Sequence, residues 1–168
     1  MAISNNTPRT IEIPLTKNYV ALVNELDSDL LEYRWHLCSR YAGRLILAPI
    51  SKKMVVLFIH RIILERILDR KLLEYEICDH INGNPMDNRR CNLRIATHAE
   101  NMRNSKKRKH SKNQYKGVSQ NCKSKTTWRA QIRVNGKRIH LGTFSSPEEA
   151  YKAYCEGAVK YHGDFAKF

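Results

Sequence analysis

The stretch "DHINGNPMDNRRCNLRIATHAENMRNS", residues 79–105, decides the fold of the middle of this chain. "YEICDH", which runs into it, has the composition of a strand, "INGNPMDN" is rich in turn residues, and "NLRIA" is strand-like again. "THAENMRNS" begins with Thr97 and carries Glu100 three residues later, the spacing of a capping box at the start of a helix. The predicted order is therefore strand, long turn, strand, helix.

The composition of the whole chain points to a polyanionic partner. Its 168 residues contain 30 Lys and Arg against 16 Asp and Glu, a formal net charge of +14. Nucleic acid is the first candidate and an anionic membrane the second. The most apolar run, "VVLFI", is strand-sized and far below the roughly 18 residues of a membrane span, and "MAISNNTPRTIEI" lacks the apolar core of a signal peptide. We therefore expect no membrane partner and a cytoplasmic location.

The five cysteines are scattered along the chain without a CxxC pair. This pattern disfavours both a zinc ribbon and a disulfide framework. We expect reduced thiols and no structural zinc.

The segment before the deciding stretch, residues 8–54, reads as a small antiparallel sheet. Its strand-like pieces are "TIEIPL", "YVALV", "YRWHLC" and "GRLILAPI", and a short helix capped by Asp27 or Ser28 is predicted at "DSDLLEY". Two interpretations stay open here: Trp35 is core and the nearby arginines are solvated, or the sheet lies against DNA.

After this segment a helix is predicted at "HRIILERILDRK", whose isoleucines fall near helical spacing.

The last segment, residues 115–168, is predicted to hold three strands and one helix. Asn135-Gly136 between two strand-like runs is a strong hairpin signal. Ser146 as N-cap and Pro147 at the first helical position predict a helix. That helix presents small and aromatic residues on one face: Ala150, Ala153, Tyr154, Gly157, Ala158 and Tyr161.

The residues of the deciding stretch also suggest chemistry. Asp79 and His80 end the first strand, and Asn101 lies in the first turn or so of the helix, so a strand-strand-helix unit that folds back can bring them together. A carboxylate and an amide oxygen suit a hard divalent ion, and a neutral His beside it can take a proton from water. The alternative is an Asx-rich hairpin loop without chemistry.

Residues 58–105 resemble the HNH nuclease motif, the ββα-metal fold, through "DH", "DNR", "NLR" and "EN" at their spacings and through the preceding "HR" helix with His60 and Arg61. The resemblance implies that Asp79 and Asn101 are metal ligands, that His80 is the general base, and that Asn92 ties the loop and steadies the His. One divalent ion, Mg or Mn, is implied, with its shell completed by phosphate and water. The first segment is similar to the N-terminal sheet of phage-type HNH homing endonucleases, which implies a phage-infected bacterial host.

The last segment resembles the ERF-type DNA-binding domain through "YKGVSQN", "WRAQIRVNGKRIHLGTF" and "EEAYKAYCEGAVKYHG". The resemblance implies a sheet that lies in the major groove with the helix behind it. The implied DNA-facing residues are Lys116, Gln120, Lys123, Trp128, Arg129, Gln131, Arg133, Arg138 and His140. By strand alternation Arg129, Gln131 and Arg133 share one face, while Trp128 does not follow the alternation and is predicted at the sheet edge.

A run of basic residues precedes this segment, with six Lys or Arg in residues 103–112. It is either a solvated linker or a tether on phosphates. The residues of this run that we predict to bind DNA are Lys106, Lys107, Arg108 and Lys109.

Together these patterns predict an α+β protein: a small N-terminal antiparallel sheet, a central ββα-metal HNH unit, and a C-terminal three-stranded antiparallel sheet packed on one helix. The predicted boundaries are 1–54, 55–105, a basic linker at 106–114, and 115–168. The predicted function is a site-specific, metal-dependent DNA endonuclease, homing-endonuclease-like, that acts on double-stranded DNA as a monomer without an obligate protein partner. The alternatives are a non-cleaving DNA-binding regulator on an HNH scaffold and, less favoured by the ERF-type sheet, an RNA-directed protein.

Overall fold

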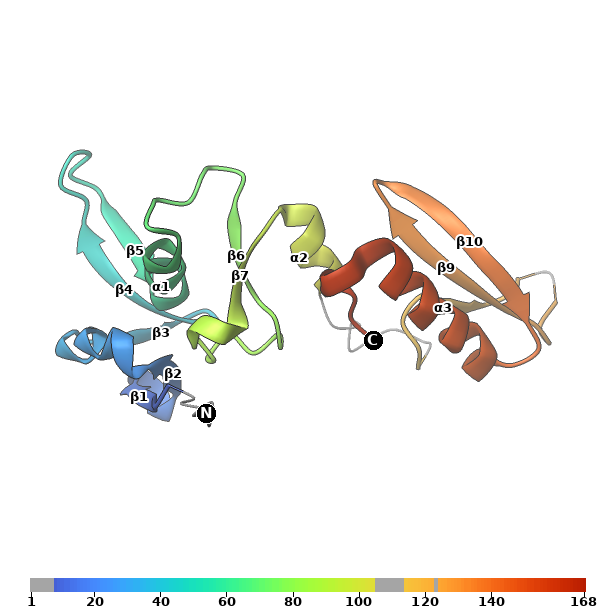
Figure 1. Ribbon diagram of the computed structural model, residues 1–168, viewed down its shortest axis with the longest axis horizontal. Helices are drawn as coiled ribbons and strands as arrows, with labels where there is room; N and C mark the ends of the chain where they lie inside the picture. The colour runs from blue at the N-terminus through green and yellow to red at the C-terminus, as the bar shows by residue number, and fades with distance from the viewer. Residues whose placement is uncertain (1–7, 105–113, 123) are drawn as a thin grey trace, which may run out of the picture. The chain divides into compact units, whose positions relative to one another are not determined.

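The computed structural model describes residues 8–104, 114–122 and 124–168, and the chain divides into two compact units (Figure 1). The first unit is Met1–Ala96 and the second is Thr97–Phe168. Both combine helices with small antiparallel sheets, so the α+β prediction is confirmed.

The first unit consists of three small antiparallel sheets, one helix and short 3₁₀ turns. Strands β1 and β2 pair with each other, β3 and β5 flank β4, and β6 pairs with β7. The bounds are β1 Thr10–Pro14, η1 Thr16–Asn18, β2 Val20–Asn24, η2 Glu25–Glu32, β3 His36–Cys38, β4 Tyr41–Leu47, β5 Met54–Phe58, α1 Ile59–Leu68, β6 Ile77–His80, η3 Arg90–Asn92 and β7 Leu93–Ala96.

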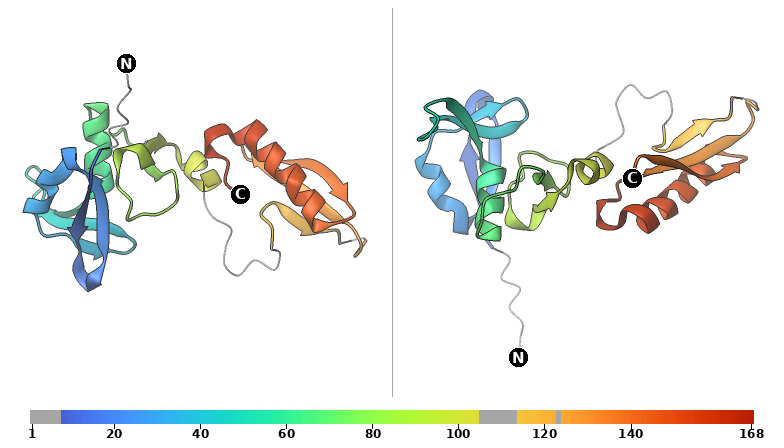
Figure 2. Two further views of the ribbon diagram at one scale, coloured as in Figure 1. Left: turned by 60° about the horizontal axis from the view of Figure 1, so that its bottom comes forward. Right: turned by 90° about the horizontal axis from the view of Figure 1, so that it is seen from above.

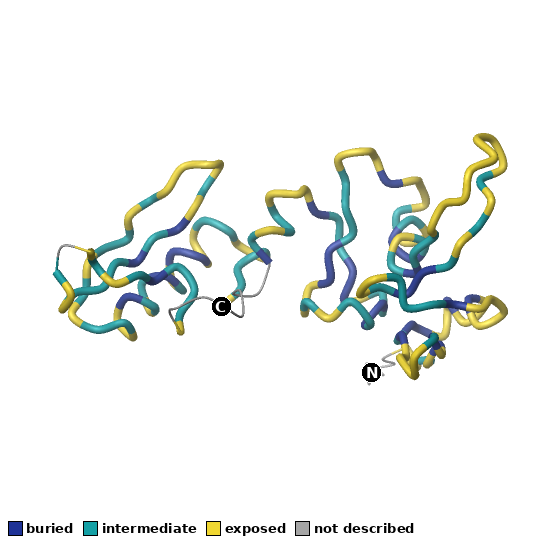
Figure 3. The backbone as a smooth tube through the Cα atoms, turned by 180° about the vertical axis from the view of Figure 1, so that it is seen from behind, coloured by how far each residue is buried: buried dark blue, intermediate teal, exposed yellow. Residues whose placement is uncertain are grey.

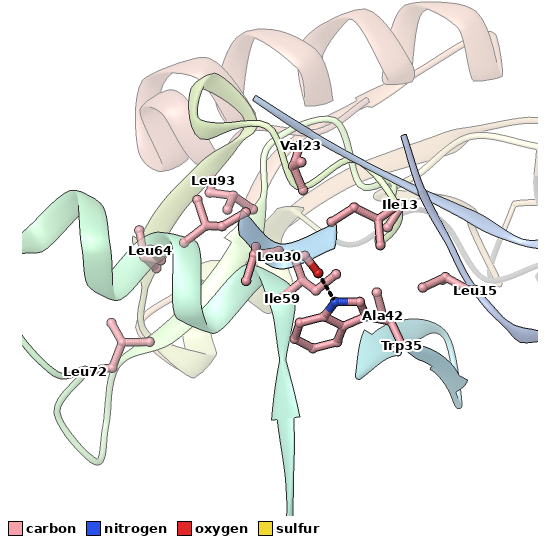
Figure 4. Packing of buried hydrophobic residues seen from close by; sticks show 12 residues of the cluster. Ile13, Leu15, Val23, Leu30, Trp35, Ala42, Ile59, Leu64, Leu72 and Leu93 are labelled. Atoms are coloured by element: carbon pink, nitrogen blue, oxygen red, sulfur yellow. Dashed lines mark hydrogen bonds between the residues drawn. The ribbon is translucent and has the colours of Figure 1, made fainter. Parts of the chain in front are cut away.

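All three sheets and α1 contribute to one hydrophobic core, shown in Figure 4. Trp35 lies in its centre and donates a hydrogen bond from Nε1 to the carbonyl of Leu30 at 2.7 Å. Ile59 and Ile63 of α1 and Leu93 of β7 belong to the same cluster. Trp35 is therefore a core residue, and the sequence boundary at residue 54 falls inside one packed unit.

The predicted short helix at residues 27–33 is instead the kinked 3₁₀ segment η2, and neither Asp27 nor Ser28 caps it. The Asp27 carboxylate is fully buried and is used elsewhere. Its Oδ1 accepts from Arg66 at 3.0 Å and from Arg90 at 2.9 Å, and its Oδ2 accepts from Arg90 at 2.8 Å. The carboxylate is turned to these two distant arginines rather than to the backbone N–H groups of its own turn, which explains the difference.

The second unit begins with α2 (His98–Asn104), and Thr97 and Glu100 form the predicted capping box. The Glu100 carboxylate accepts from the Thr97 N–H at 2.8 Å, and the Thr97 hydroxyl accepts from the Glu100 N–H at 3.3 Å. The remaining elements are β8 Val118–Gln120, β9 Trp128–Val134, β10 Lys137–Phe144, α3 Pro147–His162 and η4 Gly163–Phe165.

Helix α3 covers one face of the β8–β9–β10 sheet (Figure 2). The hairpin between β9 and β10 turns at Asn135 and Gly136, both with positive φ, as an Asn-Gly turn requires. Ser146 caps α3 by accepting from the Glu149 N–H. Gly117 packs directly under Tyr154, because a Cβ there would lie 2.0 Å from the ring. The prediction of three strands and one helix for this segment is confirmed.

We predict that Asp27→Ala lowers the free energy of unfolding of the first unit by about 3 kcal/mol, because it leaves two arginines without their buried partner. The measurement is urea unfolding followed by Trp35 fluorescence in a Trp128→Phe background. Asp29→Ala is the matched control: its carboxylate also pairs with Arg66 but is about half exposed, so its loss costs about 1 kcal/mol or less. Equal effects of the two substitutions would contradict the role given to Asp27.

Candidate active site and DNA-binding face

The candidate site lies where β6 ends. In the register of β6 and β7, Asp79 stands opposite Arg94 and His80 opposite Leu93. Both Asp79 and His80 are buried. Arg94 Nε donates to Asp79 Oδ2 at 2.8 Å, so the carboxylate is held in one orientation from the neighbouring strand. Asp79 and His80 are thus adjacent groups on a rigid strand end.

Asn92 ties the loop that follows. Its Oδ1 accepts from the Asn82 N–H at 2.9 Å, and its Nδ2 donates to the Asp87 carbonyl at 2.7 Å and to Asn82 Oδ1 at 3.1 Å. The Ile81 N–H donates to the Asn92 carbonyl at 2.9 Å. One side chain therefore joins both ends of the loop to its middle.

His80 makes a hydrogen bond with the side-chain oxygen of Asn88, a residue that was not among the predicted site residues. His80 Nε2 lies 3.2 Å from Asn88 Oδ1, and Asn88 is fully buried. Asn88 Nδ2 donates to the Met86 carbonyl at 3.2 Å, which fixes the amide. The sequence signal was "DNR" in the motif, but an Asn among several in a turn gave no reason to prefer this one.

The N-terminal hairpin holds the same loop from outside. The Leu22 N–H donates to the Met86 carbonyl and the Asn88 N–H donates to the Leu22 carbonyl, both at 2.8 Å. The backbone on either side of Asp87 is therefore fastened to β2. Asp87 itself receives two hydrogen bonds from the Arg89 guanidinium at 2.7 Å, which keep it on the loop.

Aromatic rings and a second imidazole surround His80. The centroid of His60 lies 5.3 Å away at an angle of 70°, and that of Tyr41 lies 6.0 Å away and stacked. Phe58 stacks on the other side of His60 at 5.4 Å. This largely apolar surround takes His80 out of water and restricts its ring orientation.

Burial is the main reason that the pKa values of both histidines are lowered. For His80, burial outweighs the hydrogen bond to Asn88 and the charge of Asp79, which act in the opposite direction. For His60, burial together with the charges of His80 and Arg61 lowers the pKa to about 3. Among the described residues none makes a hydrogen bond with the buried Nδ1 of His60. Both rings are therefore neutral at pH 7.

The donors predicted for a metal ion are of the right type. No group of three or more His, Cys, Asp or Glu that could hold a metal exists among the described residues. The ligands that the resemblance implies are one carboxylate, Asp79, and one amide, Asn101, and oxygen donors of both kinds suit Mg or Mn. Asn101 lies on α2, at the start of the second unit. Its partnership with Asp79 stays a prediction.

In the second unit, the open face of the three-stranded sheet carries most of the predicted DNA-facing residues. The register pairs Arg138 with Arg133, His140 with Gln131, and Thr143 with Arg129, so these side chains share the face away from α3. Arg133, Arg138 and His140 are exposed. Gln131, Arg133 and Arg138 line a shallow hollow in this face together with Ser119.

Three predicted DNA-facing residues are placed differently. Trp128 packs against the core of the second unit rather than at a free edge, on the same side as Ala130 and Ile132. Gln120 stands opposite Trp128 in the register and donates to the Lys125 carbonyl. Lys116 is half-buried, and its ammonium group donates to the carbonyls of Arg103 and Lys167 at 2.9 and 3.1 Å.

These placements have a simple cause. Strand alternation puts Gln120 and Trp128 on the helix side of the sheet, and the carbonyl groups around Lys116 solvate its charge within the unit. The remaining predicted contacts, Lys123 and Lys106, Lys107, Arg108 and Lys109, lie outside the described residues.

Comparison with known proteins finds a family match in the middle of the chain. The sequence profile described as HNH endonuclease matches residues 57–103. Protein 3.8 of Escherichia phage T7 is 33% identical over 90 residues, which cover 54% of this chain and 73% of that protein. The chain belongs to the HNH endonuclease family. An uncharacterized HNH endonuclease, L560, of Acanthamoeba polyphaga mimivirus is 28% identical over 135 residues, 79% of this chain and 69% of that protein. No solved structure matches the chain.

The HNH endonuclease match runs from the end of β5 through α1, β6, the Asx-rich loop and β7 into α2. It therefore contains every residue of the candidate active site and supports a nuclease that acts on DNA with a divalent metal. The ERF-type segment lies outside this match, and its role stays a prediction. In the described parts of the chain, helices long and apolar enough to cross a membrane are absent.

We predict that His60→Phe flattens the acid dependence of stability. The unfolded chain binds a proton on His60 below its ordinary pKa of 6.5, whereas the folded chain does so only near 3. Neutral His60 therefore makes its full contribution to the free energy of unfolding above pH 6.5, and this contribution is lost as the pH falls toward 3. About 2 kcal/mol is lost between pH 7 and pH 5.

The measurement is the difference in unfolding free energy between pH 7 and pH 5 for the wild type and for His60→Phe, by Trp35 fluorescence in the Trp128→Phe background. The variant should lose less stability over this interval than the wild type. The same loss in both proteins would show that His60 is not the group that titrates.

Proposed function

We propose that this protein is a site-specific, metal-dependent DNA endonuclease, homing-endonuclease-like, that hydrolyses a phosphodiester bond with His80 as general base. The observation that supports this most directly is the arrangement at the end of β6. A buried His80 stays neutral beside a fixed carboxylate, and both lie inside the matched HNH endonuclease segment. A neutral imidazole next to a carboxylate is what activation of water at neutral pH needs.

The partner of His80 decides which ring nitrogen takes the proton. Because Asn88 Nδ2 donates to the Met86 carbonyl, Asn88 Oδ1 is the atom turned toward His80 and can only accept. His80 Nε2 therefore carries the proton, and Nδ1 has the lone pair that accepts one from water. Asn92 acts through the loop: it holds Asn82 and Asp87 and so keeps the segment that presents Asn88 in place.

Asp79 and Asn101 would hold one divalent ion, Mg or Mn, with phosphate and water as further ligands. When bound, such an ion supplies charge stabilisation for the phosphate and its leaving oxygen. Arg94 fixes the Asp79 carboxylate by a hydrogen bond of 2.8 Å, so the carboxylate is oriented before substrate arrives. This preorganisation is the contribution of the protein itself.

Site selection is assigned to the surfaces around this centre. The open face of the C-terminal sheet has Arg and Gln side chains that suit guanine and adenine edges in the major groove of duplex DNA. Tethered modules raise each other's effective concentration, so each needs only modest affinity. We propose a monomer on DNA that cuts one strand at each HNH site.

We predict that His80→Ala lowers the nicking of supercoiled plasmid DNA in Mg or Mn at least about a hundredfold, because the general base is lost. Binding of the same DNA should stay nearly unchanged, and chelator should abolish nicking by the wild type. His36→Ala, which removes an imidazole from β3 of the same unit, is the control and should nick normally.

Equal losses of binding and nicking in His80→Ala would assign His80 a structural role. Binding to a mapped site without nicking in either metal would instead indicate the non-cleaving regulator.

We predict that the double substitution Arg133→Ala and Arg138→Ala weakens DNA binding and flattens its salt dependence, with a slope of log K against log salt smaller by about 2 if each arginine contacts a phosphate. The measurement is fluorescence anisotropy of labelled duplex over a series of salt concentrations. The matched control, Lys152→Ala with Lys160→Ala, removes the same charge from the exposed side of α3. Equal slopes for the two double variants would show that net charge, rather than the open face of the sheet, determines the salt dependence of DNA binding.

A further inference from the structure

The hairpin of β4 and β5 extends away from the rest of the first unit (Figure 1), and much of its length is exposed (Figure 3). Its exposed residues include several large apolar ones. Leu45 stands opposite Val56, and Leu47 opposite Met54. Because these positions are two residues apart, all four side chains lie on the same face of the ribbon. Their exposed fractions are 61, 39, 56 and 59%. An apolar face of this kind is unusual on a protein surface without a partner.

The tip of this hairpin is a defined turn. The Ala48 N–H donates to the Lys53 carbonyl at 2.8 Å, and the Lys52 N–H donates to the Ala48 carbonyl at 3.0 Å. Ile50 lies at the end of the turn and is 97% exposed. The tip thus presents one apolar side chain ahead of two exposed lysines.

The apolar face continues without a break to the candidate active site. Gly43 and Phe58 form the next pair along the ribbon. A Cβ on Gly43 would lie 3.0 Å from Val56 and 3.1 Å from Phe58, so the absence of a side chain lets these two close over the strand. Phe58 in turn stacks on His60, which contacts His80. The apolar face is therefore linked to His80 through two ring contacts, Phe58 with His60 and His60 with His80.

The charge around the hairpin identifies the class of partner. No Asp or Glu occurs in residues 33–64, whereas the same stretch contains Arg34, Arg40, Arg44, Lys52, Lys53 and Arg61. A second copy of this chain would bring the same positive hairpin and be repelled. A polyanion that also offers apolar surface is the complementary partner, and duplex DNA meets both conditions.

We propose that the β4–β5 hairpin enters the minor groove next to the cleaved phosphate and that Ile50 inserts as a wedge between base pairs. In the major groove, side chains without hydrogen-bonding groups can contact only the thymine methyl group, whereas apolar wedges in the minor groove unstack base steps and bend the duplex. Lys52 and Lys53 bind the flanking phosphates. The strand from Phe58 to Met54 spans about 13 Å, roughly four base steps, so Ile50 at the tip lies at least this far from the cut.

This inference rests on the proposed nuclease function, and the experiment separates the two. The hairpin variant combines Leu47→Ser, Ile50→Ser and Met54→Ser, and the matched control combines Leu26→Ser, Leu31→Ser and Tyr75→Ser, which are exposed apolar residues elsewhere in the first unit. Nicking of supercoiled plasmid is measured for both and for the wild type. Binding and bending of a duplex that spans the mapped nick are measured in the His80→Ala background by end-to-end energy transfer.

The hairpin variant should bind about tenfold more weakly, bend the duplex less and nick more slowly, while the control behaves like the wild type. Netropsin, a minor-groove ligand, should inhibit the wild type more than the hairpin variant.

If the hairpin variant binds, bends and nicks like the control, the role given to the hairpin is wrong, although the proposed nuclease function stands. If wild-type protein neither binds nor nicks any DNA, both proposals fail. A self-associated wild type in light scattering that the hairpin variant converts to monomer would assign the face to a second copy instead.

Discussion

One buried carboxylate, that of Asp27, joins the parts of the first unit that the sequence keeps far apart. It accepts hydrogen bonds from Arg66 on α1 and from Arg90 at the end of the Asx-rich loop, and it lies in the N-terminal segment itself. A charge this deeply buried is costly unless its oxygens are paired, so the two arginines tie α1 and the Asx-rich loop to the N-terminal segment. The small N-terminal sheet therefore cannot be a loosely attached arm.

The attachment matters because it supports the loop of the candidate active site. Strand β2 holds the backbone at Met86 and Asn88, and Asn88 in turn holds the His80 ring. Polar groups of the N-terminal segment, Asn24 and Asp27, fix Arg90 at the other end of the loop. The segment that the sequence suggested as a DNA-contacting sheet thus also keeps His80 in position.

The two units expose surfaces of different chemistry. The open face of the C-terminal sheet is polar and basic, with Arg133 and Arg138 side by side, whereas the hairpin of the first unit is apolar with lysines at its tip. Polar side chains can distinguish base edges, and apolar side chains respond to how easily a duplex is deformed. If both proposals hold, the second unit would supply sequence readout, and the first unit would supply the local distortion that brings a phosphate to His80.

The sequence by itself determined the local features, because each depends on residues a few positions apart. The capping box of Thr97 and Glu100, the Asn135-Gly136 turn and the Ser146 cap formed as predicted, and so did the alternation that places Arg129, Gln131 and Arg133 together. The residues of the HNH endonuclease motif also lie close enough together in the chain to be recognised from the sequence.

Only the tertiary structure decided which partner each polar group takes. Asn88 rather than another loop amide contacts His80, Asp27 binds two distant arginines instead of capping its own turn, and Lys116 turns inward to carbonyl groups. The physical reason is that a buried polar group must find hydrogen bonds wherever the fold supplies them, and those partners lie from 8 residues away, for Asn88 and His80, to 63 residues away, for Asp27 and Arg90.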